Sequence, residues 1–150
     1  MTNITCSKCY NEHFSFEGFT ILSLYLSMKS KTNMNLNEIL TINDCFSEYI
    51  KKEELKEENK FLCSSCKRKQ NCVKSHILYL LPKILILHLK RFKTFIKGKM
   101  DFVKDRTKIL INEFIDIKQF VSKDVIGSTK YRLYAMINHD GNLESGHYTA

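Results

Sequence analysis

Four of the six cysteines form two Cys-x-x-Cys pairs, a spacing that suits the binding of a metal ion. The pairs are Cys6/Cys9 and Cys63/Cys66. A Cys-x-x-Cys turn lets both thiolates point at one ion, and two such turns complete a tetrahedral four-sulfur site for Zn²⁺. Four thiolates leave no open coordination position, so the ion would be structural rather than catalytic. The sequence therefore predicts a structural Zn²⁺ held by these four cysteines.

Two alternatives to zinc binding stay open for these cysteines. The four thiols could carry no ion, or one pair could be a redox motif of the thioredoxin type, although that motif needs a single pair in a βαβ setting. The two pairs are further apart than the roughly 15–20 residues of a compact zinc ribbon, so a metal ion would join distant segments. Cys45 and Cys72 have no partner at motif spacing, and we expect both to be small buried apolar side chains.

The elements that must position these residues are mostly strands. The stretch 14–27 alternates between apolar and polar residues, which predicts a strand. The stretch 35–49 has apolar residues at helical spacing, with Asn35 as a candidate N-cap and Asn43-Asp44 as a candidate break. The chain has only one proline and five glycines, so few sharp stops interrupt its elements.

The second half of the chain is predicted to be almost entirely β. Strands are expected over 70–80, 84–92, 131–138 and 147–150, and a short strand and turn over 107–120. The strand over 84–92 starts with apolar residues on both faces, which favours a central place in a sheet. The polar, basic stretch 93–105 is expected to be an exposed connection, and 139–146 a loop.

Composition narrows the class of protein. The length of 150 residues fits one domain or part of one. The sequence contains no run of 18 apolar residues, so it predicts no membrane span. No secretory signal is visible either. We therefore expect an intracellular protein of the cytoplasm, the nucleus or both, where disulfides are rare. The net charge of +8 could indicate nucleic-acid binding, but no basic motif with interleaved aromatic residues accompanies it.

Five blocks of this sequence resemble, in order, the catalytic domain of the ubiquitin-specific proteases. They are Cys6-x-x-Cys9 with the strand Phe19-Thr-Ile-Leu-Ser-Leu; Leu36-Asn-Glu-Ile-Leu with Phe46 and Glu54-Leu55; Asn59-Lys-Phe-Leu-Cys63-x-x-Cys66 with Gln70 and Lys74; Leu81-Pro-x-Ile-Leu-Ile-Leu-His88-Leu-Lys-Arg-Phe92; and Tyr131-Arg-Leu-Tyr-Ala-Met-Ile-Asn-His139 with Gly146-His147-Tyr148. The last two blocks are the most specific. The resemblance covers nearly the whole chain.

This resemblance implies an α+β fold with a papain-like palm and antiparallel β fingers that carry the zinc site. Residues 1–150 would be part of one catalytic domain, with about 1–80 as fingers and about 81–150 as palm. It implies a cysteine-type deubiquitinating enzyme that cleaves peptide and isopeptide bonds at the ubiquitin C-terminus. The implied partners are ubiquitin and ubiquitinated proteins, and no membrane.

The resemblance also indicates which of the five histidines would be the catalytic base. Thiol proteolysis needs an imidazole that activates a cysteine. By resemblance His147 is that base, and Gly146 and Tyr148 flank the bound ubiquitin tail. His139 ends a predicted strand and is expected to brace the following loop, while His88 is expected to be a hydrogen-bonded structural histidine. His13 and His76 are expected to be surface or sheet residues.

Two parts of the family pattern are not found in these residues. The nucleophile would lie in an Asn-x-x-Cys-Tyr/Phe-x-Asn-type box before Cys6, and an Asp or Asn would follow the histidine box at some distance; Asp140 precedes His147 and does not fit that role. We therefore expect part of a longer enzyme, without its thumb and inactive by itself. The alternatives are a non-catalytic ubiquitin-binding or scaffold protein and, more remotely, a basic zinc module that binds nucleic acid.

Overall fold

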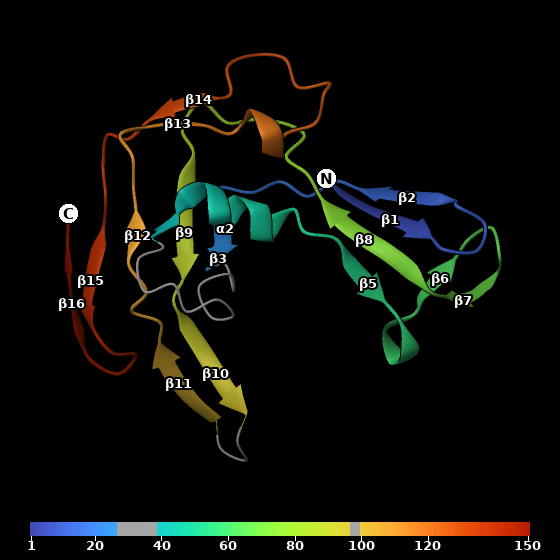
Figure 1. Ribbon diagram of the computed structural model, residues 1–150, viewed down its shortest axis with the longest axis horizontal. Coiled ribbons are helices and arrows are strands. Elements are labelled where there is room, and N and C mark those ends of the chain that lie inside the picture. The colour runs from blue at the N-terminus through green and yellow to red at the C-terminus, as the bar shows by residue number, and fades with distance from the viewer. Residues whose placement is uncertain (27–38, 97–99) are drawn as a thin grey trace.

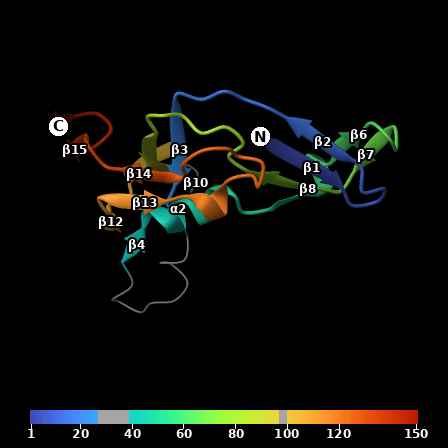
Figure 2. The same ribbon diagram turned by 90° about the horizontal axis from the view of Figure 1, so that it is seen from above.

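The computed structural model describes residues 1–26, 39–96 and 100–150. Its elements form two regions that extend in opposite directions (Figures 1 and 2). One region is a sheet built from strands of the first half of the chain. The other contains the α-helix and the strands of the C-terminal third, with the C-terminus at its far end. The structure combines several short sheets with a helix, which confirms the predicted α+β class.

The first region is a four-stranded antiparallel sheet in the order β2-β1-β8-β5. Its strands are β1 (Thr2–Cys6), β2 (Glu12–Ser15), β5 (Glu53–Leu55) and β8 (Cys72–His76). A hairpin of β6 (Phe61–Cys63) and β7 (Arg68–Gln70) lies at its outer end (Figure 1). A 3-10 turn over Glu57–Asn59 precedes β6. The strand predicted over 70–80 is thus shorter, because Leu78 leaves this sheet and forms a bridge with Val121.

The second region is built on a parallel pair of strands from opposite halves of the chain. Strand β3 (Ile21–Tyr25) pairs in parallel with β9 (Ile86–Lys90). Leu22, Leu24 and Leu26 are buried, as the alternation predicts, and pack in one cluster with Phe46 and Phe120. The rings of these two phenylalanines stack at 5.1 Å. Residues of the first half thus contribute directly to the core of the second region.

The described α-helix is α2 (Ile42–Tyr49). It begins later than predicted, because Thr41 is its N-cap: the Thr41 Oγ1 accepts from the backbone N–H of Asp44, whose carboxylate accepts from the Thr41 N–H at 2.9 Å. This capping box places Asn43 and Asp44 in the first turn instead of at a break. The other candidate cap, Asn35, lies outside the described residues. In the ranges described, no helix is long and apolar enough to cross a membrane.

The expected central position of the strand over 84–92 is wrong for the described part of the chain. There β9 pairs only with β3. Leu85, Leu87 and Leu89 pack against the core, whereas the intervening Ile86 is 50% exposed. Residues that are apolar on both faces of a strand therefore do not fix how many strands flank it.

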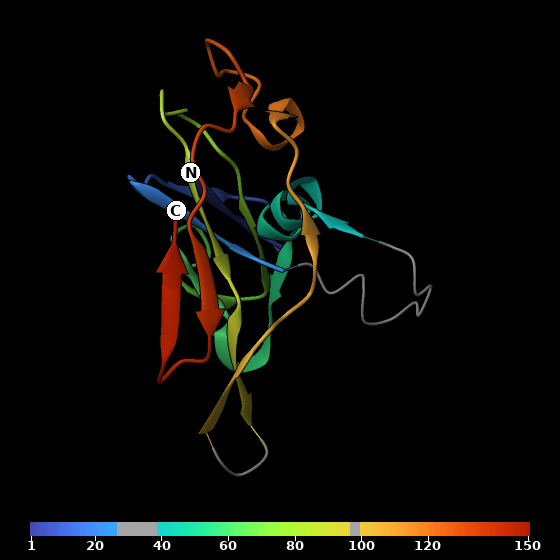
Figure 3. The same cartoon turned by 90° about the vertical axis from the view of Figure 1, so that its left-hand side faces the viewer.

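The remaining strands form short pairs around this core (Figure 3). They are β4 (Leu40–Thr41) with β12 (Ile109–Leu110), β10 (Phe92–Ile96) with β11 (Met100–Lys104), β13 (Phe114–Asp116) with β14 (Lys130–Arg132), and β15 (Asn138–Gly141) with β16 (Gly146–Thr149). A 3-10 turn over Lys118–Phe120 follows β13. The stretch 93–105 is thus mostly a β-hairpin, not the predicted connection. The predicted loop 139–146 shrinks to 142–145, because β15 continues to Gly141.

Candidate functional site

The two Cys-x-x-Cys pairs meet at the outer end of the first region. Cys6 ends β1 and Cys63 ends β6, and each strand leads into a tight turn that carries the second cysteine of its pair. The Sγ atoms of Cys6, Cys9, Cys63 and Cys66 all lie within 4.8 Å of one another. The fold thus brings together all four predicted ligands, from segments far apart in the sequence.

The cluster has the size that a four-thiolate metal site requires. Zn–S bonds of about 2.3 Å in a tetrahedron place sulfur atoms about 3.8 Å apart. The Sγ atoms of Cys9 and Cys63 are 3.6 Å apart. The backbone N–H of Cys66 points at the Cys63 Sγ at 3.5 Å, a contact that stabilises negative charge on sulfur. These four cysteines could therefore hold a metal ion.

Hydrogen bonding shifts the pKa values of these thiols in opposite directions. A backbone hydrogen bond with Asn11 lowers the pKa of Cys9 to about 6. Backbone hydrogen bonds with Cys9 and Lys8 lower the pKa of Cys6. The hydrogen bond with Cys9 raises the pKa of Cys66 to about 12, because a second thiolate beside the first is unfavourable. A divalent cation would take the place of these shared protons, so metal binding at this cluster must release protons.

The other two cysteines do not belong to the set of four possible ligands. Cys45 and Cys72 are 0% and 1% exposed, which confirms their predicted burial. Cys72 packs beside Cys6 and Cys63, its thiol points to the carbonyl of Gln70 at 3.6 Å, and burial raises its pKa. It is thus next to the cluster without being part of it.

Both turns of the cluster contain a feature that the sequence did not reveal. The residue after each pair, Tyr10 or Lys67, has a left-handed backbone with φ of 57° and 55°. Glycine is the usual residue for this conformation. Because neither position is a glycine, the sequence contains no signal for a left-handed residue in these turns. The side chain of Tyr10 is 77% exposed, so packing does not compensate for the backbone strain there.

Glycine at position 67 is expected to stabilise the protein. The variant Lys67→Gly relieves a left-handed conformation that costs about 1–2 kcal/mol for other residues, while the greater freedom of the unfolded chain takes back about 0.4–1 kcal/mol. We expect the free energy of unfolding to rise by roughly 0.5–1 kcal/mol, measured by urea denaturation. The matched control Lys69→Gly, inside β7, should instead destabilise by about 0.5–1 kcal/mol. Equal effects of the two variants would contradict the assignment of strain to this turn.

The predicted catalytic histidine lies on the β15–β16 hairpin, at the other end of the molecule (Figure 1). His147 is the second residue of β16, whose four residues are all exposed. Its cross-strand partner is Asp140, but the Asp140 carboxylate accepts from the backbone N–H of Gly141 at 2.9 Å. Within the described ranges, no residue forms a hydrogen bond with the His147 imidazole. The imidazole of His147 is therefore accessible to solvent and to a bound partner.

Gly146 is required by close packing in this hairpin. A Cβ atom at this position would collide with the Nε2 of His139 and lie 2.6 Å from the carbonyl oxygen of Asp140. The Asn142 side chain closes the turn by accepting from the backbone N–H groups of Glu144 and Ser145 at 3.0 and 2.8 Å. The backbone before His147 is therefore fixed by contacts that leave no room for a larger residue.

His139 lies inside β15 and not, as predicted, at the end of a strand, and it is held by a lysine that the sequence did not indicate. The Nζ of Lys104 lies 2.9 Å from the Nδ1 of His139. An ammonium group only donates, so Nδ1 must accept and the ring proton sits on Nε2. The ring of His139 also packs 4.6 Å from that of Tyr148. His139 is thus part of the support of the hairpin.

The other three histidines lie away from this hairpin. His13, His76 and His88 form side-chain hydrogen bonds with Asn11, Thr2 and Ser23, at 3.1, 3.0 and 3.1 Å respectively. Burial lowers the pKa of His76. His88 is hydrogen bonded, as predicted, although its side chain is exposed. None of these partners is a carboxylate that would orient a catalytic base.

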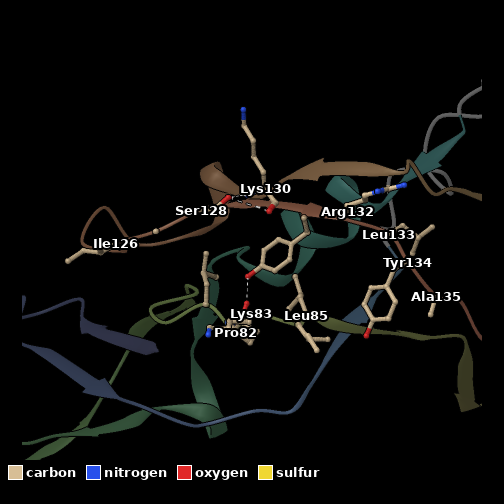
Figure 4. A pocket seen from close by; sticks show the side chains of 14 residues that line it. Pro82, Lys83, Leu85, Ile126, Ser128, Lys130, Arg132, Leu133, Tyr134 and Ala135 are labelled. Carbon is tan, nitrogen blue, oxygen red and sulfur yellow. Dashed lines mark hydrogen bonds between the residues drawn. The ribbon is translucent and has the colours of Figure 1, made fainter.

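A cavity of about 560 Å³ lies between the segment around Pro82 and strand β14 (Figure 4). The hydroxyl of Tyr131 donates to the carbonyl of Pro82 across it at 2.7 Å. None of the predicted site residues lines this cavity. The predicted site residues lie instead on the β15–β16 hairpin and in the cysteine cluster.

Comparison with known proteins places these features in a family. The family model for ubiquitin carboxyl-terminal hydrolase matches residues 2–150. Ubiquitin carboxyl-terminal hydrolase 4 of Saccharomyces cerevisiae is 32% identical over 161 residues, which cover 99% of this chain and 17% of that protein. Ubiquitin carboxyl-terminal hydrolase 21 of Rattus norvegicus is 35% identical over 154 residues, covering 98% and 25%. The chain thus spans a quarter or less of the length of these relatives.

Solved structures show the same fold. A chain of the SAGA Ubp8/Sgf11/Sus1/Sgf73 DUB module bound to monoubiquitin matches with a TM-score of 0.78 and 25% identity, over 98% of this chain and 30% of that one. A second structure of the module, bound to ubiquitin aldehyde, matches with a TM-score of 0.76. The predicted fold, part of the palm and fingers of a ubiquitin-specific protease, is confirmed. Because the family model covers almost every residue, the chain belongs to the ubiquitin carboxyl-terminal hydrolase family.

Proposed function

We propose that this chain is part of a cysteine-type deubiquitinating enzyme that cleaves peptide and isopeptide bonds at the C-terminus of ubiquitin. The observation that carries the proposal is the family match over residues 2–150, together with an exposed His147 on a hairpin whose packing is specific. A similar chain in a solved DUB module bound to monoubiquitin supports ubiquitin as the partner. Ubiquitinated proteins would be the substrates.

In this proposal His147 is the general base. Its imidazole would take the proton of a cysteine thiol, and the thiolate would attack the carbonyl carbon at the end of ubiquitin. The C–N bond would then break as the imidazolium gives its proton to the leaving amine, and water would hydrolyse the resulting thioester and release the thiol. Gly146 and Tyr148 would flank the ubiquitin tail. Exposure of the whole of β16 supports this role, because a tail laid along the strand would meet all three residues.

The six cysteines offer no nucleophile near His147. Four form the cluster at the opposite end of the molecule, and Cys45 and Cys72 are buried. We propose that the attacking thiol comes from outside these 150 residues, and that they are inactive by themselves. Their contribution would be the base and much of the ubiquitin-binding surface.

We also propose that the cluster of Cys6, Cys9, Cys63 and Cys66 binds a structural Zn²⁺. The ion would supply charge neutralisation and a cross-link between the turn after β1 and the β6–β7 hairpin. The fingers would comprise about residues 1–16 and 51–77, because β3 and most of α2 pack in the palm core, with the ring of Tyr49 at the end of α2 contacting His76 of the fingers sheet. The proposed compartment is the cytoplasm, the nucleus or both.

Covalent capture tests the activity directly. Lysate from the native source would be treated with ubiquitin that carries a thiol-reactive C-terminal group, and the captured proteins mapped by peptide mass. We expect peptides of this chain in an adduct well above the sum of 17.7 kDa and ubiquitin. Prior treatment with N-ethylmaleimide should abolish the adduct. Peptides that are abundant in the lysate but never captured would favour the alternative, a non-catalytic ubiquitin-binding protein.

A further inference from the structure

Lys104 makes three hydrogen bonds to the hairpin that carries His147. Its Nζ donates to the Nδ1 of His139 at 2.9 Å, to the carbonyl of His139 at 2.6 Å and to the carbonyl of Gly141 at 3.3 Å. An ammonium group has three N–H donors, so these bonds use its whole capacity. The contact is half-buried and joins residues 35 and 37 positions apart.

The position of these bonds in the hairpin is specific. The two carbonyls belong to the residues on either side of Asp140, and Asp140 is the cross-strand partner of His147. In an antiparallel pair, backbone groups that do not face the partner strand point to its outer edge. Lys104 therefore holds the outer edge of β15 at the place where its inner edge pairs with His147.

The bond to the Nδ1 of His139 fixes a ring that packs next to the proposed catalytic position. His139 lies so close to Gly146 that no Cβ would fit there, and its ring is 4.6 Å from that of Tyr148. The ammonium holds the ring in one orientation and one tautomer. Both residues that flank His147 thus rest on a side chain that Lys104 orients.

The lysine itself is anchored in the core region. It pairs with Phe92 at the base of the β10–β11 hairpin, and the next residues are tied down by Arg91. The guanidinium of Arg91 donates to the carbonyls of Asp105 and Thr107 at 3.1 and 2.8 Å. The backbone N–H of Asp105 returns a bond to the Arg91 carbonyl at 2.6 Å. We call the three hydrogen bonds of Lys104 to His139 and Gly141 the clamp. It connects β16, through β15, to strands that continue directly from the palm core.

We propose that Lys104 is a positioning residue for the base His147, acting through His139 and the outer edge of β15. This inference rests on the proposed function, because it assigns Lys104 a part in the same reaction. Lys104 would not touch the substrate or the thiol. It would fix where the imidazole stands, and a displacement of about 1 Å at a catalytic group can cost about a hundredfold in rate.

The test compares Lys104→Met with Lys108→Met in the full-length protein that contains these 150 residues. Lys108 is an exposed lysine of the same segment and serves as the matched control. Active sites would be counted with the thiol-reactive ubiquitin, and turnover of a fluorogenic ubiquitin amide expressed per counted site. We expect Lys104→Met to lower kcat by about 10–100-fold with KM within about twofold, because ubiquitin would still bind. A merely structural role would reduce the number of sites and leave kcat per site unchanged.

A second measurement does not depend on activity. Hydrogen exchange of the peptide over 138–149 should become faster in Lys104→Met and stay as in the wild type in Lys108→Met. Unchanged exchange, or a kcat per site equal to that of the control, would overturn the inference. A wild-type protein that neither reacts with the ubiquitin reagent nor cleaves the amide would overturn the proposed function instead, and the exchange comparison would still decide whether the clamp exists.

Discussion

Replacing Cys63 with serine is expected to abolish zinc binding and to unfold the outer end of the fingers. Cys63 is fully buried, its Sγ lies 3.6 Å from the Cys9 Sγ, and it accepts from the backbone N–H of Cys66. A serine hydroxyl there stays protonated and is a poor zinc ligand. In zinc-finger peptides a structural zinc ion supplies roughly 10–16 kcal/mol of apparent binding free energy. The loss should therefore far exceed the roughly 1 kcal/mol of an average substitution.

The expected loss rests on what else holds this part of the chain. Among the described residues, only Cys6, Cys63 and Cys72 form its buried cluster, with a few partly buried neighbours. Strands β6 and β7 have three residues each, and a short isolated hairpin is marginal in water. The metal would thus supply most of the stability that the small apolar cluster lacks.

The measurement is zinc content per folded molecule, with protease sensitivity of 61–70 as the structural readout. Cys72→Ala is the matched control, because Cys72 is equally buried and touches the cluster without belonging to it. We expect about one zinc ion in the wild type and in Cys72→Ala, and far less in Cys63→Ser. Zinc retained in Cys63→Ser, or lost in Cys72→Ala, would show that the ligand set is different.

The four cysteines could be predicted from sequence because a Cys-x-x-Cys turn is local. The spacing within each pair allows both thiols to point at one ion, so only the meeting of the two turns depends on the fold. The alternation of Leu22, Leu24 and Leu26 is local in the same way. It requires one buried face whatever strand lies next to it, and all three are buried.

Features that depend on distant partners could not be predicted. The start of α2 was missed for a different reason: the capping box of Thr41 and Asp44 is local and visible in the sequence, but the apolar spacing from position 36 onward favoured an earlier start. Lys104 looked like one more residue of a basic exposed stretch. Its role appears only when the β10–β11 hairpin carries it to the edge of β15. Exposure of Ile86 likewise depends on which strands lie beside β9.

Replacing His147 with glutamine in the full-length protein is expected to lower kcat/KM by at least about a thousandfold. General-base catalysis contributes roughly 10²–10⁴ in rate, and a thiol that depends on its imidazole loses nucleophilicity as well. The side chain is exposed and no described residue bonds to its ring, so the substitution should leave folding intact. Cleavage of a fluorogenic ubiquitin amide measures the loss, and an unchanged melting temperature shows that the protein is folded.

Two further histidines make the result specific. His88→Gln is the matched control, because His88 is also exposed on a strand and bonds only to Ser23 among the described residues; we expect activity within about twofold of the wild type. His139→Gln should fall between the two, because it breaks the bond to Lys104 and the packing on Tyr148 while leaving the base in place. A larger loss in His139→Gln than in His147→Gln would reverse the roles of the two residues. The Nδ1 of His139 already accepts from an ammonium group, and its Nε2 faces Gly146, so neither nitrogen is available to take a proton from a thiol. In this hairpin, His147 is the histidine whose ring nitrogens are free of described hydrogen-bond partners and can take a proton from a thiol.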